Sequence, residues 1–200
     1  LLFHPKWGPM IDSQRIAAVG HSLGGYTVLA NGGMEIEMDA FIAYCEEFPN
    51  NADCRFYQSG GVDFNAVDLT QFEQSYKDER IKAIVSIDPA YARSFDPASL
   101  DIMPSTLLIR AGLIHSKLGD LQGGFLGEAL IKNGHHYVSM DSAHHFSYLQ
   151  ACKPIGWYLL GMVEEDGHFL CSSEDGIGRA EIHDQTSHLI IEFLTKNGIY

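Results

Sequence analysis

The sequence predicts an α/β fold built on a mostly parallel sheet. Three observations support this: short apolar runs of strand length, helical segments between these runs, and one strand, turn and helix packed into residues 15–33. Strands that alternate with helices along a chain typically pair in parallel, and the helices form the crossovers. The alternation therefore places the chain in the α/β class.

The first unit carries the clearest signals. Residues 15–20 are apolar after Arg15, as in a strand that is buried on both faces. A glycine-rich turn follows, and residues 26–31 are expected to form a helix that ends at Gly32-Gly33, since glycine commonly terminates helices. A strand that runs directly into a helix is a compact βα unit.

The next segment, residues 34–79, is expected to leave the sheet as an excursion of loops and helices. Residues 41–48 and 67–76 are candidate helices. Residues 45–63 are polar and contain Asn50-Asn51 and Gly60-Gly61, so a loop is expected there.

The remaining elements return to the sheet. Residues 81–89 form a second apolar strand, which ends in Asp88 and Pro89, and proline cannot continue the strand's hydrogen bonding. The other expected elements are a strand at 104–112, a helix at 124–132, a short strand at 137–140 and an amphipathic helix at 178–197.

The composition narrows the classes of function. The 26 acidic and 13 basic residues give a formal net charge of −13, which disfavours a nucleic-acid surface, because phosphate binding needs clustered Lys and Arg. No apolar run approaches the roughly 18 residues of a membrane span. The expected partners therefore include neither a nucleic acid nor a membrane crossing.

The four cysteines fall into two local pairs, Cys45 with Cys54 and Cys152 with Cys171. Neither pair has the spacing of a zinc site. Two disulfides that close short loops are the favoured interpretation, and four free thiols are the alternative. Because disulfides persist in oxidising compartments, the favoured pairing predicts a secreted or periplasmic protein.

One motif carries chemistry. Gly20-His21-Ser22-Leu23-Gly24 matches G-x-S-x-G between an expected strand and helix, which is the context of a nucleophile elbow. In such a turn the serine hydroxyl is presented at the sheet edge, and the N–H of the next residue, Leu23, can stabilise an oxyanion. A serine that merely caps the helix is the alternative interpretation.

A nucleophilic serine needs a base and an orienting carboxylate, in the order Ser, Asp or Glu, His for this type of turn. His145 follows the last expected strand and is the favoured base. Asp88, at the end of a neighbouring strand, is the favoured acid, and Asp120 is the second choice. His21 and Phe146, which adjoin the serine and the histidine, are expected to contact substrate.

These segments resemble a known family. Residues 15–26, 81–90 and 142–149 are similar to the nucleophile, acid and histidine segments of α/β-hydrolases of the dienelactone hydrolase and plasma-type platelet-activating factor acetylhydrolase group. The resemblance implies an α/β-hydrolase fold, a triad of Ser22, Asp88 and His145, and small or short-acyl esters as substrates. His144 stands where the family commonly has glycine.

The resemblance also implies a further segment. The family carries several strands before the one that leads to the nucleophile, together with the loop that supplies the second oxyanion donor. Residues 1–200 are therefore expected to be the C-terminal part of a single hydrolase domain, and the N-terminal part is an expected partner.

The expected function is a serine ester hydrolase that forms an acyl-enzyme and needs no metal or organic cofactor. An acyltransferase or lipase with the same triad is an alternative, as is a non-catalytic binding protein on the same fold. Aromatic residues that could line a substrate pocket are Tyr91, Phe95, Phe125, Phe146 and Trp157.

Overall fold

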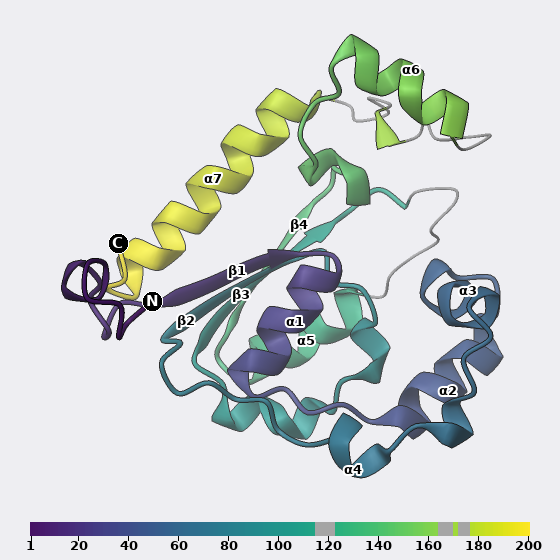
Figure 1. Cartoon of the computed structure of the whole chain (residues 1–200), viewed down its shortest axis with the longest axis horizontal. Helices are drawn as coiled ribbons and strands as arrows, with labels where there is room; N and C mark the ends of the chain where they lie inside the picture. Colours follow the sequence, from purple (N-terminus) through teal and green to yellow (C-terminus); the bar gives the residue numbers. More distant parts are fainter. Residues whose placement is uncertain (115–122, 164–169, 172–176) are drawn as a thin grey trace.

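The computed structural model describes residues 1–114, 123–163, 170–171 and 177–200, which contain a four-stranded parallel sheet (Figure 1). The strands are β1 (Ala17–His21), β2 (Ala83–Ile87), β3 (Ser105–Ala111) and β4 (His136–Met140). They lie in the order β1-β2-β3-β4, and each neighbouring pair is parallel. The predicted α/β class is therefore confirmed.

Helices cover both faces of the sheet. They are α1 (Leu23–Gly32) and α5 (Gly123–Lys132) on one face and α7 (Arg179–Lys196) on the other (Figure 1). Ile84 and Leu108 face α1 and α5, whereas Val85 and Ile109 belong to the core under α7. Because successive strand residues point to opposite faces, consecutive apolar residues of β2 and β3 contribute to both cores.

Residues 34–79, called the insert below, leave the sheet after α1 and build a small core of their own. Their helices are α2 (Met38–Glu47), α3 (Ala52–Ser59) and α4 (Leu69–Phe72). Buried residues of α2 pack against Ala90 and Tyr91, which follow β2. The insert therefore lies against the segment that leaves the C-terminal end of β2.

The expected loop over residues 45–63 is wrong at its centre, where α3 forms. Helix α3 is short and polar on average, and its buried side chains are Asp53 and Cys54, so its composition resembles that of a loop. The Cys45–Cys54 disulfide links α3 covalently to α2. A covalent link and tertiary packing thus stabilise a helix whose own sequence pattern is weak.

Other parts of the chain show where periodicity succeeds and fails. The tail helix α7 lies within the predicted 178–197, whereas α4 is shorter than the predicted 67–76. Helix α6 (Pro154–Val163) was not predicted, because it is apolar on all sides and has no helical period. Cys152 and Cys171 form the second disulfide. Within the described ranges, no helix combines the length and apolar character that a membrane crossing requires.

Candidate active site

Ser22 occupies a strained turn between β1 and α1. Its φ of 58° lies in the left-handed region, which a residue with a side chain rarely adopts. The Ser22 N–H donates to the Ile87 carbonyl over 3.0 Å, and the Ser22 carbonyl accepts from the N–H of Ala90 at 3.2 Å. These bonds to the β2 end hold a conformation that costs about 1–3 kcal/mol.

Three predicted residues meet at this turn. His145 Nε2 lies 2.9 Å from Ser22 Oγ, and His145 Nδ1 lies 2.7 Å from Asp88 Oδ2. A carboxylate only accepts, so Nδ1 carries the proton and Nε2 is left to accept from the Ser22 hydroxyl. His145 is 7% exposed and Asp88 4%, which keeps water from competing for these bonds.

Asp88 is oriented by the strand beside it. Its Oδ1 accepts from the Ala111 N–H at 3.0 Å, and its own N–H donates to the Ile109 carbonyl at 2.7 Å. Its φ of 39° turns the side chain out of the strand and toward His145. Asp120, the second choice for the acid, lies outside the described residues.

His145 begins η5 (His145–Tyr148), and a reciprocal cap holds this short helix. The Phe146 N–H donates to His144 Nδ1 at 3.1 Å, and the His144 N–H donates to Ser147 Oγ at 2.9 Å. His144 thus has a local role that glycine could not fill. The cap fixes the backbone from which the His145 ring projects.

The His21 side chain contacts the backbone of His145. Burial, with His145 nearby, lowers the pKa of His21 to about 4, so its ring is neutral at pH 7. His21 Nε2 lies 2.9 Å from the His145 carbonyl, which only accepts, so Nε2–H is the donor. The Phe146 ring lies edge-on to the His145 ring at 5.1 Å. Substrate contact by His21 or Phe146 stays a prediction.

Leu23 opens α1 directly after the nucleophile. Its N–H is one of the first-turn amides that have no acceptor within the helix, and it lies at the positive end of the helix dipole. Leu23 is 55% exposed, so this end of the helix lies at the surface. The residue directly after the nucleophile thus offers a main-chain N–H to an oxyanion formed at Ser22.

Comparisons with family models, curated proteins and solved structures give no match. A hydroxyl on a strained turn, an imidazole that can accept its proton and a carboxylate that orients the imidazole form a nucleophile with its base. Such a set can attack an acyl carbonyl.

Asp53 is a residue near the site that the sequence analysis missed. It projects from α3 of the insert, is 4% exposed, and accepts from the Tyr91 N–H at 2.9 Å. Burial raises the pKa of Asp53 to about 6, and nearby Asp88 adds to the rise, whereas the Tyr91 N–H and His145 oppose it. The one sequence signal was its position beside Cys54, a predicted disulfide cysteine.

The raised pKa predicts a change in stability with pH. Folded Asp53 keeps its proton up to about pH 6, whereas the unfolded chain releases it near 3.8. Its favourable contribution is therefore present below pH 3.8 and lost as the pH rises through 6. Asp53→Asn keeps an acceptor for the Tyr91 N–H and does not titrate. As the pH rises from about 4 to 7.5, we therefore expect the free energy of unfolding of this variant to increase relative to that of the wild type by on the order of 2–3 kcal/mol.

Urea unfolding of both proteins at about pH 4 and about pH 7.5 measures this difference in unfolding free energy. Asp101→Asn, which changes an exposed carboxylate shortly before β3, is the control and should show the same stability change at both. An Asp53→Asn effect that does not change with pH would contradict the prediction.

Proposed function

We propose that this protein is a serine ester hydrolase with an α/β-hydrolase fold, of the kind that the dienelactone hydrolase resemblance implies. The proposal is carried by one observation: a continuous hydrogen-bond chain from Asp88 through His145 to Ser22, whose backbone lies in a strained turn. A serine that only capped α1 would not need a buried imidazole and carboxylate behind it, and the Ser22 side chain makes no cap bond.

The geometry supports acyl transfer in two steps. His145 Nε2 takes the Ser22 proton as Oγ attacks the ester carbonyl, and the Leu23 N–H stabilises the oxyanion. The ester C–O bond then breaks, and His145 passes the proton to the leaving alcohol. Water attacks the acyl-enzyme while His145 accepts its proton, and that proton returns to Ser22 Oγ as the acid leaves. Asp88 stabilises the transient imidazolium.

The proposal includes an oxidising compartment. Both predicted pairs, Cys45–Cys54 and Cys152–Cys171, are disulfide-bonded, which supports a secreted or periplasmic protein. These bonds lie in the insert and beside α6, outside the chain of residues that reacts.

Labelling with a fluorophosphonate probe tests the proposal directly. We expect one covalent adduct, located at Ser22 by peptide mass spectrometry, and no adduct in Ser22→Ala. Hydrolysis of p-nitrophenyl acetate should fall by roughly 10⁴–10⁶-fold in that variant, as is typical when a triad nucleophile is removed. Equal labelling of the variant and the wild type would place the nucleophile elsewhere and end the proposal.

A further inference from the structure

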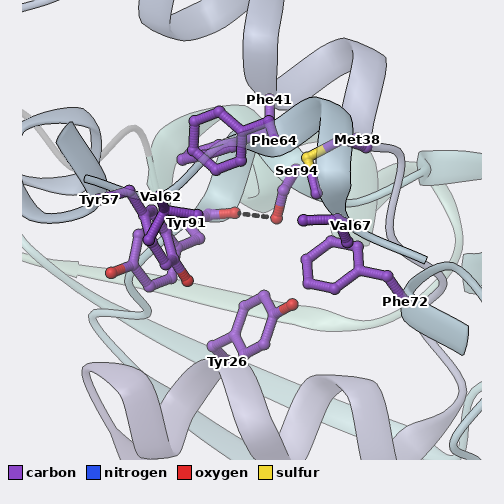
Figure 2. Close-up of a pocket in the computed structure, with 10 residues that line it drawn as sticks. All are labelled: Tyr26, Met38, Phe41, Tyr57, Val62, Phe64, Val67, Phe72, Tyr91 and Ser94. Carbon is purple, nitrogen blue, oxygen red and sulfur yellow. Dashed lines mark hydrogen bonds between the residues drawn. The ribbon is translucent and has the colours of Figure 1, made fainter. Parts of the chain in front are cut away.

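An apolar pocket lies between the insert and the sheet domain (Figure 2). Figure 2 shows Tyr26 rising from α1 on one side and residues of the insert facing it from the other. Six aromatic side chains make most of the wall: Tyr26, Phe41, Tyr57, Phe64, Phe72 and Tyr91. Of the five aromatics that the sequence suggested for a pocket, Tyr91 lines this one.

Two residues that line the pocket, Tyr26 and Tyr91, follow Ser22 and Asp88 closely in the chain. Tyr26 lies one helical turn after Ser22, and its N–H donates to the Ser22 carbonyl at 3.0 Å. Tyr91 lies three residues after Asp88, and its N–H is held by Asp53, whose pKa responds to both Asp88 and His145. Two residues that line the pocket are therefore held by the same backbone segments that carry Ser22 and Asp88.

The lining has the chemistry of a site for uncharged groups. Among the described residues that line the pocket, none is Asp, Glu, Lys, Arg or His. Burial raises the pKa of Tyr26 and of Tyr91 well above the ordinary tyrosine value, so both rings stay neutral at any physiological pH. Ser94 Oγ already donates to the Tyr91 carbonyl at 2.7 Å. A charged ligand would thus lose its hydration here without gaining a partner.

The cavity volume limits the size of the ligand. The pocket measures about 90 Å³. Sites that enclose a drug-sized ligand are typically about 300–1,000 Å³. The pocket is therefore suited to a short chain or a single small ring.

We propose that this pocket binds a small, uncharged apolar substituent of the ester, and that the insert thereby selects the substrate. The proposal rests on the proposed esterase function. The substituent can come from the acyl side or the alcohol side of the ester, because both offer the same apolar chemistry to the same rings.

Filling the pocket tests the proposal. Val62 lines it and is 43% exposed, so Val62→Phe should narrow the pocket without disturbing a core. We expect kcat/KM for p-nitrophenyl butyrate to fall about 10–100-fold in this variant, while that for the acetate changes less than about 3-fold, since one methylene in an apolar site is worth about 10–200-fold. Val67→Phe, also in the lining, should act alike.

Leu69→Phe is the matched control, because Leu69 belongs to the insert, is exposed and does not line the pocket. A second substrate series, methyl, propyl and butyl acetate, separates the alcohol side from the acyl side. If the dependence of kcat/KM on chain length changes in the acyl series, the pocket binds the acyl substituent. If it changes in the alcohol series, the pocket binds the alcohol substituent. Unchanged profiles in both series for both pocket variants, or an equal change in Leu69→Phe, would overturn the proposal.

Direct binding separates this inference from the esterase proposal. Saturation-transfer NMR with toluene on Ser22→Ala reads the pocket without catalysis, and the signal should be lost when Val62→Phe is added. If the fluorophosphonate fails to label Ser22, the esterase function fails, and the toluene measurement still decides whether the pocket accepts an apolar ligand. If Ser22 is labelled and toluene does not bind, the pocket inference alone fails.

Discussion

Replacing Asp88 with asparagine is expected to lower kcat for p-nitrophenyl acetate by roughly 10⁴-fold while the protein stays folded. The asparagine oxygen can still accept from the Ala111 N–H, and asparagine tolerates the left-handed backbone at this position. Its amide nitrogen, however, donates toward His145 Nδ1. The imidazole proton then moves to Nε2, which faces Ser22 and can no longer accept from its hydroxyl.

A second carboxylate–histidine pair in the chain is the matched control. His188 Nδ1 lies 3.5 Å from Asp184 Oδ2, and both side chains are exposed on α7. Asp184→Asn should leave kcat within about 2-fold, since exposed ion pairs contribute little. Steady-state kinetics and thermal unfolding of both variants make the comparison. Full activity in Asp88→Asn would exclude this residue as the triad acid.

Replacing Gly20 with alanine is expected to destabilise the fold by about 3 kcal/mol. A Cβ at this position would lie 2.2 Å from the Gly24 carbonyl oxygen and 2.9 Å from the Gly25 nitrogen. Both are backbone atoms of α1, so the whole strand–helix turn must shift to relieve the contact. Because Ser22 lies in that turn, fluorophosphonate labelling should fall together with stability.

The other glycine of the same motif gives an opposite expectation. A Cβ at Gly24 meets nothing within 4 Å, and the residue is helical without a positive φ. Gly24→Ala should therefore change stability by about 1 kcal/mol or less, with helix propensity in its favour. Urea unfolding of the two variants measures the difference. Similar destabilisation at both positions would mean that the close approach at Gly20 is not what the motif requires.

Much of the candidate site could be predicted from local sequence patterns. The apolar run to Gly20, the motif around Ser22 and the helix behind it are adjacent in the chain, so their geometry follows from local rules. Asp88 and His145 are predictable because parallel strands end at the same edge of a sheet, and the structure brings both within hydrogen-bond distance of their partners. Asp53 was missed because no local pattern distinguishes a buried carboxylate on a polar helix.

The sequence by itself determined the α/β class, the strands, and the order in which serine, carboxylate and imidazole occur along the chain. These depend on apolar periodicity and turn chemistry, which act between neighbouring residues. Only the tertiary structure decided that α3 is helical, that Asp53 holds the backbone of Tyr91, and that the insert lines an aromatic pocket together with Tyr26 and Tyr91. These depend on contacts between residues far apart in the chain, and their free energies appear only once the chain has folded.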